Sequence, residues 1–200
     1  MAVPNETHLG LRERKKLKLR RTIRSEALRL FEAQGYEQTT VEQIAEAAET
    51  STTTFYRYFP TKEDLVLDDD YDPVIEAVAA SRPRDESPAA TIRAAIAAVV
   101  EVAETERDEN IARLRLIASI PALDARLAGN ERTTIALINR VLTERTGRSG
   151  DDYQLALVAA AVVAVLFTAT RRWAAEQGAT PLATLIDQAL DTVEPLLNTL

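Results

Sequence analysis

The side chains with the most chemistry to offer lie in one short stretch, Ser51–Tyr58, which reads Ser-Thr-Thr-Thr-Phe-Tyr-Arg-Tyr. Hydroxyl groups donate and accept hydrogen bonds, and threonine methyls pack on thymine methyls, so this composition suits base edges in a DNA groove. In a helix, Phe55 and Phe59 would turn towards a core, which leaves Tyr56 and Arg57 on other faces. The alternative is a purely structural role, because threonines also cap helices and tyrosines are often half-buried core residues.

The charge distribution favours a nucleic-acid partner more than the net charge does. The chain carries −7 overall, yet residues 1–24 hold eight basic and two acidic side chains and carry +6, so the remainder carries −13. A basic end on an acidic body is expected when that end alone meets phosphate, although a solvated helix start has the same composition.

The chain has few of the residue types that catalysis or metal binding requires. It has no cysteine and one histidine, His8, which lies in a polar N-terminal segment. Thiolate sites are therefore excluded, a Ser-His-Asp triad lacks a suitable histidine, and no glycine-rich phosphate loop is present. We expect a protein that is not an enzyme and has neither a resident metal nor a cofactor.

Composition predicts an all-α fold. Hydrophobic residues make up 46% of the 200 residues, aromatic residues only 5%, and there are six glycines, a balance that favours helices over sheets. The longest apolar run, Leu155–Ala169, is shorter than the ~20 residues of a membrane span. No apolar signal segment precedes the basic stretch, so a cytoplasmic location is expected.

Apolar periodicity and stop residues divide the first third into short helices. Ile23, Ala27 and Phe31 share one face of a long first helix, which Gly35 ends. A Thr40-x-x-Gln43 capping box starts the next helix. The expected helices cover residues 11–34, 40–49, 52–59 and 61–80, and residues 1–10 are expected to be disordered. The second and third form a helix-turn-helix.

The remainder is expected to be helical as well, with breaks at Pro121, Gly129, Gly147 and Gly178. The last two helices are apolar almost all round, which predicts that both are buried. The expected helices cover residues 88–107, 110–119, 124–127, 130–145, 152–177 and 181–198. The expected organisation is a basic N-terminal arm with the start of the first helix (1–19), a three-helix DNA-binding domain (20–66) and a larger helical ligand-binding and dimerisation domain (67–200).

Residues 20–71 contain a set of residues whose order and spacing are characteristic of a known family. They are Phe31, Gly35-Tyr36, Thr40, Ile44-Ala45, Ala48, Ser51, Thr54, Phe55-Tyr56, Tyr58-Phe59 and Lys62-Glu63-Asp64-Leu65. In this order they resemble the DNA-binding domain of the TetR family of transcriptional repressors. Two departures stand out: the usual turn Gly-Val is Glu49-Thr50 here, and the usual Lys-Gly is Thr52-Thr53. The operator sequence therefore cannot be predicted.

The resemblance implies a role for each matching residue. Thr40 is expected to hold phosphate and Ser51 to cap the recognition helix, while Tyr58 and Lys62 hold the DNA backbone. The residues expected to contact DNA are Arg20, Thr40, Ser51, Thr52, Thr53, Thr54, Tyr56, Arg57, Tyr58 and Lys62. The basic segment 12–21, taken as an arm before the first helix, is expected to follow the backbone or enter the minor groove. It would add affinity more than sequence choice.

The C-terminal part carries a second resemblance. Residues 113–121 (Arg-Leu-Arg-Leu-Ile-Ala-Ser-Ile-Pro) and Arg171-Arg172-Trp173 are similar to TetR regulators with an acyl-CoA-like ligand-binding domain, including mycofactocin-system regulators. This implies a mostly apolar effector, such as a long-chain acyl-CoA. The expected cavity lining is Val99, Leu114, Ile117, Phe167 and Trp173, with Arg113, Arg115 or Arg171 as polar anchors. The alternative is an ordinary core with solvated arginines.

The most apolar helices predict a homodimer. Helices 152–177 and 181–198 from two subunits can form a four-helix bundle that places two recognition helices about one DNA turn, ~34 Å, apart. A ligand that binds the released state more tightly would free a palindromic operator, which describes a ligand-responsive repressor with double-stranded DNA and a small effector as partners. An activator and an architectural DNA-binding protein without a ligand stay open as alternatives.

Overall fold

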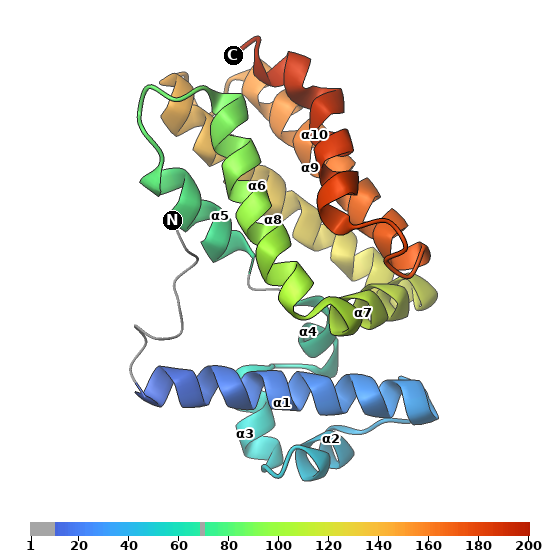
Figure 1. Ribbon diagram of the computed structural model, residues 1–200. Helices are drawn as coiled ribbons and strands as arrows, with labels where there is room; N and C mark the ends of the chain where they lie inside the picture. Colours follow the sequence, from blue (N-terminus) through green and yellow to red (C-terminus); the bar gives the residue numbers. More distant parts are fainter. Residues whose placement is uncertain (1–10, 69–70) are drawn as a thin grey trace. The chain divides into compact units, whose positions relative to one another are not determined.

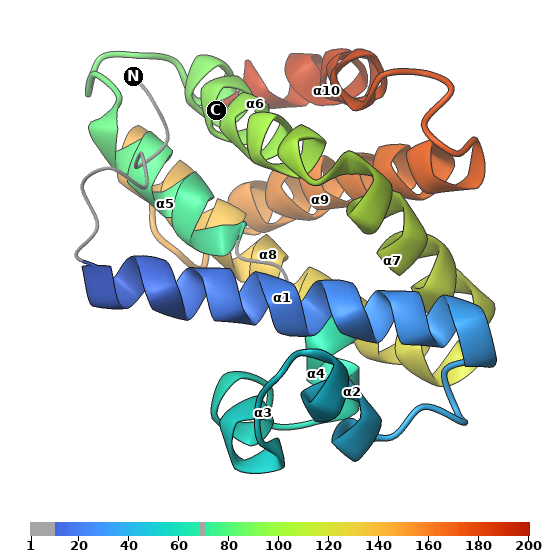
Figure 2. The same ribbon diagram turned by 60° about the horizontal axis from the view of Figure 1, so that its bottom comes forward.

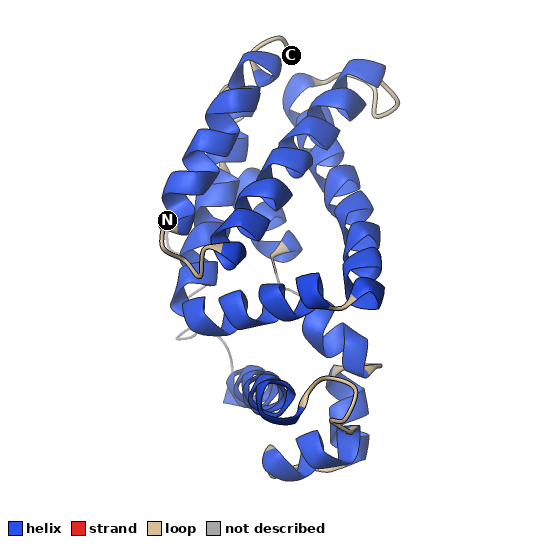
Figure 3. Ribbon diagram, turned by 90° about the vertical axis from the view of Figure 1, so that its right-hand side faces the viewer, coloured by secondary structure: helices blue, strands red, loops and turns tan. Residues whose placement is uncertain are grey.

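The computed structural model describes residues 11–68 and 71–200, with side chains of the first helix from Lys15 onward. Every regular element in those ranges is a helix, as Figure 3 shows, so the all-α prediction is confirmed. The chain divides into two compact units, residues 1–68 and 69–200 (Figure 1). The expectations for residues 1–10, including His8, and for the side chains of Arg12 and Arg14 lie outside the described residues.

The described residues of the first unit form four helices, of which the first is by far the longest. They are α1 (Leu11–Gln34), α2 (Val41–Ala47), α3 (Thr52–Tyr58) and α4 (Lys62–Leu67) (Figure 2). The spacing of Ile23, Ala27 and Phe31 predicted their burial, which is confirmed. The basic segment belongs to the first half of this continuous helix from residue 11 onward. Its interpretation as an arm that precedes the helix is therefore wrong for those residues.

Helix starts are set by local capping, as the sequence indicated. The Thr40 hydroxyl accepts a hydrogen bond from the Gln43 backbone N–H at 3.3 Å, and the Gln43 side chain accepts one from the Thr40 N–H at 3.0 Å. Side-chain oxygens of Ser51, Thr61 and Asp152 cap α3, α4 and α9 in related ways. Each such cap satisfies an otherwise unpaired backbone donor, typically worth about 1 kcal/mol.

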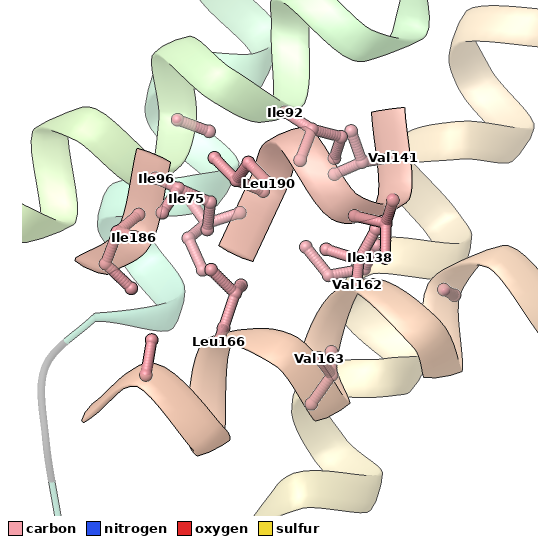
Figure 4. Packing of buried hydrophobic residues seen from close by; sticks show 14 of the residues in the cluster. Ile75, Ile92, Ile96, Ile138, Val141, Val162, Val163, Leu166, Ile186 and Leu190 are labelled. Carbon is pink, nitrogen blue, oxygen red and sulfur yellow. The ribbon is translucent and has the colours of Figure 1, made fainter. Parts of the chain in front are cut away.

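In the second unit, residues 71–200 form six helices that pack around one apolar core. They are α5 (Asp72–Ser81), α6 (Pro88–Thr105), α7 (Arg107–Ser119), α8 (Pro121–Thr146), α9 (Tyr153–Ala175) and α10 (Leu182–Leu197). Helix α9 packs against both α8 and α10, while α5 packs against α6. Figure 4 shows how side chains from these helices meet, among them Ile96, Ile138 and Val162.

The prediction of a single helix over residues 61–80 is wrong. Helix α4 ends at Leu67, where Asp68 takes an extended conformation (φ −66°, ψ 127°), and α5 begins at Asp72. Pro73 explains the second start, because proline lacks the N–H that a helix interior needs but fits the first turn of a helix.

The predicted break at Gly129 is also wrong. A single helix, α8, runs through this glycine in place of the two helices expected over 124–127 and 130–145. An interior glycine costs only about 1 kcal/mol relative to alanine. Burial of Leu123 and Leu127 before it, and of Leu137 and Ile138 after it, outweighs that cost.

The last two helices are less uniformly apolar than expected. Helix α10 has a polar face on which Asp187, Asp191 and Glu194 all approach Arg93 of α6, at 3.7, 2.6 and 2.5 Å. Helix α9 is, among the described residues, the one helix long and apolar enough to cross a membrane. Only 39% of its most apolar window is buried, so the prediction that the whole helix is buried is wrong. A core helix of a soluble protein has the same composition.

Candidate nucleic-acid interface and internal cavity

The turn between α2 and α3 is held by two backbone hydrogen bonds. The Glu49 N–H donates to the Glu46 carbonyl at 3.0 Å, and the Thr50 N–H donates to the Ala45 carbonyl at 2.8 Å. This is the Schellman pattern, whose left-handed position is usually glycine. Here Glu49 occupies it with φ 51°, so the turn keeps its shape although the residue lacks the freedom of glycine.

Helix α3 buries one face and exposes another. Phe55 and Phe59 are fully buried, as their spacing predicted, and their ring centroids lie 5.9 Å apart. Tyr56 is 52% exposed, and Thr53 and Arg57 are exposed beside it. The helix therefore presents hydroxyl, phenol and guanidinium groups to solvent from a rigid base.

Some hydroxyl groups at the start of α3 form hydrogen bonds within the protein. The Ser51 hydroxyl accepts a hydrogen bond from the Thr54 N–H at 3.1 Å and lies 3.0 Å from the Thr54 hydroxyl. Thr40 and Ser51 are both exposed, and Thr52, Thr54 and Tyr58 are half-buried. The Arg57 guanidinium lies 5.5 Å from the centroid of the Tyr58 ring at the end of α3, within cation–π distance.

Lys62 connects the loop before α2 to the start of α4. Its ammonium group donates to the backbone carbonyls of Tyr36 at 2.8 Å and Thr39 at 3.1 Å. It also lies 4.1 Å from the centroid of the Tyr36 ring, a cation–π distance. The structure thus gives Lys62 an internal role, and its contact with DNA stays a prediction.

Arg20 belongs to a cluster that closes the first unit. Its guanidinium lies 3.4 Å from the Asp68 carboxylate and 5.0 Å from the centroid of the buried Phe59 ring. Arg24, one turn later, donates to the Asp68 carbonyl at 2.8 Å and faces the same ring at 5.7 Å. We call Arg20, Arg24, Phe59 and Asp68 the α1–α4 clasp. Arg20 was expected to contact DNA; the structure gives its guanidinium these internal partners, and its contact with DNA stays a prediction.

The second unit contains a cavity of about 130 Å³. Six of the predicted lining residues surround it: Val99, Arg113, Leu114, Phe167, Arg171 and Trp173. Ile117 is buried but is not among the lining residues, and Arg115 is exposed elsewhere on α7. The sequence did not reveal the contribution of α5, which supplies Ile75 together with Tyr71 and Asp72 at its start.

Polar groups line only part of the cavity. Helices α6 and α10 contribute apolar residues alone, whereas α5, α7, α8 and α9 contribute the polar residues Asp72, Asn110, Arg113, Thr134, Thr170 and Arg171. Burial raises the pKa of the Asp72 carboxyl above its ordinary value of 3.8, and the neighbouring Glu76 charge acts in the same direction. The cavity lining is therefore mostly apolar, with polar groups supplied by four of the surrounding helices.

Comparison with known proteins assigns both units. Residues 23–68 match the family of bacterial regulatory proteins called tetR, and residues 86–198 match the MftR C-terminal domain. The latter match alone spans more than half of the chain. The protein belongs to the TetR family. The TetR family resemblance seen in the helix-turn-helix motif is thus confirmed, as is the similarity of the C-terminal half to mycofactocin-type regulators.

Relatives of known type agree with this family. A curated relative, the HTH-type transcriptional regulator TcmR of Streptomyces glaucescens, is 33% identical over 94% of this chain and 88% of its own. FadR of Thermus thermophilus, a TetR-family repressor solved with lauroyl-CoA, is 25% identical, with 88% and 93% coverage and a TM-score of 0.59. FadR of Bacillus subtilis, solved with stearoyl-CoA, is 17% identical, with 86% and 96% coverage and a TM-score of 0.61, and shows the shared fold. This TetR-family chain is a transcriptional regulator and not an enzyme.

Proposed function

We propose that this regulator is a homodimeric repressor that binds a palindromic operator and is released by a small apolar effector. The observation that carries the proposal is the pairing, in one TetR-family chain, of an exposed recognition face on α3 with an apolar cavity in the second unit. The first suits DNA and the second suits a small molecule. The cytoplasm, where its operator would lie, is the expected location.

On DNA, Thr53, Tyr56 and Arg57 would read the major groove, because they are the exposed groups of α3. Ser51, whose hydroxyl caps that helix by accepting a hydrogen bond from the Thr54 N–H, would contribute mainly by setting its start. Lys15, Lys16 and Lys18 stand in the basic half of α1 and would add sequence-independent affinity through phosphate. Because these lysines belong to a continuous helix, we expect them to contact the DNA phosphate backbone and not to enter the minor groove.

The dimer would form through α9 and α10. Among the described residues, four large apolar side chains are exposed, and three of these lie on the last two helices: Tyr153 (76%), Leu157 (50%) and Leu196 (45%). A concentration of exposed apolar side chains marks a protein interface more often than free surface. Two such helices from each subunit are enough for a four-helix bundle.

The effector would bind in the cavity of the second unit. FadR of Thermus thermophilus was solved with lauroyl-CoA, so an acyl thioester is the first compound class to test. Tyr71 and Asp72 line the cavity and follow Asp68 of the α1–α4 clasp by only three and four residues along the chain. A ligand that displaces the start of α5 would thus act close in sequence to the end of the DNA-binding unit.

A footprint on the DNA that flanks the protein's own gene, recorded at several salt concentrations, tests this function. A short palindromic footprint lost on addition of long-chain acyl-CoA would support repressor, dimer and acyl-CoA effector together. A palindrome that acyl-CoA leaves intact would keep the DNA-binding proposal and remove this effector. A footprint without sequence preference would favour an architectural protein, and transcription that rises with the bound regulator would favour an activator.

Substitutions in α3 test whether this helix recognises the operator. Tyr56→Ala and Thr53→Ala should each weaken operator binding about tenfold, because one good base contact is worth about 1–3 kcal/mol. Arg132→Gln, which removes an exposed charge from the second unit, serves as the control. Equal loss of affinity in all three variants would contradict recognition by α3.

A further inference from the structure

One hydrogen-bond donor in the lining of the cavity lacks an acceptor. The indole N–H of Trp173 is buried, and no group within residues 11–68 and 71–200 accepts its hydrogen bond. The Trp173 side chain is 1% exposed and lines the cavity from α9. A buried donor without a partner is costly, so nearly all such groups in proteins are paired. The indole N–H therefore indicates that its acceptor comes from outside the chain.

Other polar groups of the lining have partners within the protein. The Tyr71 hydroxyl donates to the Asn110 side-chain oxygen at 3.3 Å, and the Asn110 amide donates to the Ala103 carbonyl at 2.9 Å. The Thr170 hydroxyl donates to the Leu166 carbonyl at 2.8 Å. These groups gain little from a ligand, whereas the indole N–H gains a first partner.

The two arginines of the lining do not require a negatively charged ligand. Arg113 is 4% exposed and has an interaction partner within the protein. Arg171 is half exposed, and its guanidinium lies 3.3 Å from the Asp124 carboxylate and 3.4 Å from the Glu131 carboxylate. Both positive charges thus meet groups of the chain itself, so an anion would lose its hydration without a free guanidinium to replace it.

The one carboxyl group of the lining does not require a cation. Asp72 is attracted by the Arg140 guanidinium and forms a hydrogen bond with the Thr134 side chain, and both contacts act to lower its pKa. Burial outweighs them, so the neutral form of this carboxyl is easier to reach than in water. The arginines and Asp72 together favour a ligand without net charge.

The size and the remaining walls of the cavity define the body of the ligand. Val99 and Ile96 of α6, Phe167 of α9 and Ile186 of α10 are all apolar. The volume of about 130 Å³ is close to that of an engineered cavity of about 150 Å³ that binds benzene. A body of roughly six to eight non-hydrogen atoms therefore fits without movement of a helix.

We propose that the effector is a compact neutral molecule with an apolar body and one carbonyl-type oxygen, which accepts a hydrogen bond from the Trp173 indole N–H. This proposal rests on the proposed function, because it takes the cavity as the effector site. Trp173 would then determine specificity, since the apolar walls select for size and the indole N–H selects for the acceptor oxygen.

The single tryptophan makes a direct test possible. Trp173 is the only tryptophan of the chain, so the ¹⁵N-labelled full-length protein gives one indole N–H resonance. The probes are cyclohexanone and methylenecyclohexane, which have nearly the same shape and differ in an oxygen that replaces a CH₂ group. We expect cyclohexanone to move the indole proton resonance downfield, because a hydrogen bond deshields the proton. Methylenecyclohexane should give no downfield shift.

Two variants separate the N–H from the rest of the aromatic lining. Trp173→Phe keeps an aromatic ring but removes the donor, and calorimetry should show that it weakens cyclohexanone about 2- to 12-fold more than methylenecyclohexane. Phe167→Leu is the matched control in the same helix and should weaken both probes equally. If Trp173→Phe fails to fold, the resonance of the wild-type protein still decides.

Charged analogues test the neutrality of the ligand. Cyclohexanecarboxylate and cyclohexylammonium should each bind at least about tenfold weaker than cyclohexanone, because their charges lose hydration in the cavity. Tighter binding of either ion than of the ketone would overturn the neutral class, and tighter binding of octanoyl-CoA would overturn the compact one.

An indole resonance that cyclohexanone leaves in place, or equal losses for both neutral probes in Trp173→Phe, would overturn the role of Trp173. Operator binding is measured on the same preparations. A protein that binds its operator but not the ketone contradicts the ligand proposal alone, whereas a protein that binds no operator contradicts the repressor proposal.

Discussion

Replacement of Glu49 by glycine should stabilise the DNA-binding unit. The Schellman hydrogen bonds hold Glu49 at φ 51°, where an L-residue with a Cβ costs roughly 1–2 kcal/mol. Glycine removes that strain, but its additional freedom in the unfolded chain costs about 0.4–1 kcal/mol. The net expectation is a rise of about 0.5–1 kcal/mol in the free energy of unfolding.

Urea unfolding followed by circular dichroism measures this change, and Trp173 fluorescence separately follows the second unit. Gln177→Gly is a matched control, because Gln177 has φ 52° in the same motif at the end of α9. It should stabilise the second unit to a similar extent and leave DNA affinity unchanged. Glu49→Gln removes the charge but keeps the strain. If Glu49→Gln stabilises the first unit as much as Glu49→Gly, the reasoning from backbone strain is refuted.

Three further predictions concern the second unit. Gly178→Ala should lower the free energy of unfolding by about 1–3 kcal/mol, because Gly178 has φ 72° and an added Cβ would meet the Arg107 side chain; a thermal melt unchanged from wild type would contradict this. Asp72→Asn should stabilise the protein at neutral pH. A raised carboxyl pKa means that wild-type stability falls as pH rises above 3.8, so the gain should vanish in melts recorded below that pH. Leu157→Glu should weaken the dimer at least about tenfold in sedimentation experiments, and an unchanged dimer would exclude this face as the interface.

Local features of this fold were predictable, and features that depend on distant partners were not. The capping box at Thr40 and the burial of Phe55 follow from residues within one or two turns, so their prediction succeeded. Gly129 carries the same local stop pattern as Gly147, yet only the latter ends a helix, because burial on both sides of Gly129 outweighs its low helix propensity.

The same limit applies to the sites. Lys62 looks like a phosphate contact in sequence, but its carbonyl partners lie 23 and 26 residues away and are invisible to any periodic pattern. The cavity was predicted in part, because its apolar residues follow the inner faces of the helices. The contribution of Tyr71 and Asp72 depends on the break between α4 and α5, which is absent from the single helix expected over residues 61–80.

The α1–α4 clasp has a consequence for the construction of new regulators. All four of its residues, from Arg20 to Asp68, belong to the first unit, and Asp68 is the last residue of that unit. A chimera joined after Asp68 would keep the ion pair, the carbonyl contact and both arginine–phenylalanine stacks, whereas one joined before it would lose the anchor of α4. The bond after Asp68 is therefore the best junction for joining this DNA-binding unit to the ligand-binding domain of another regulator.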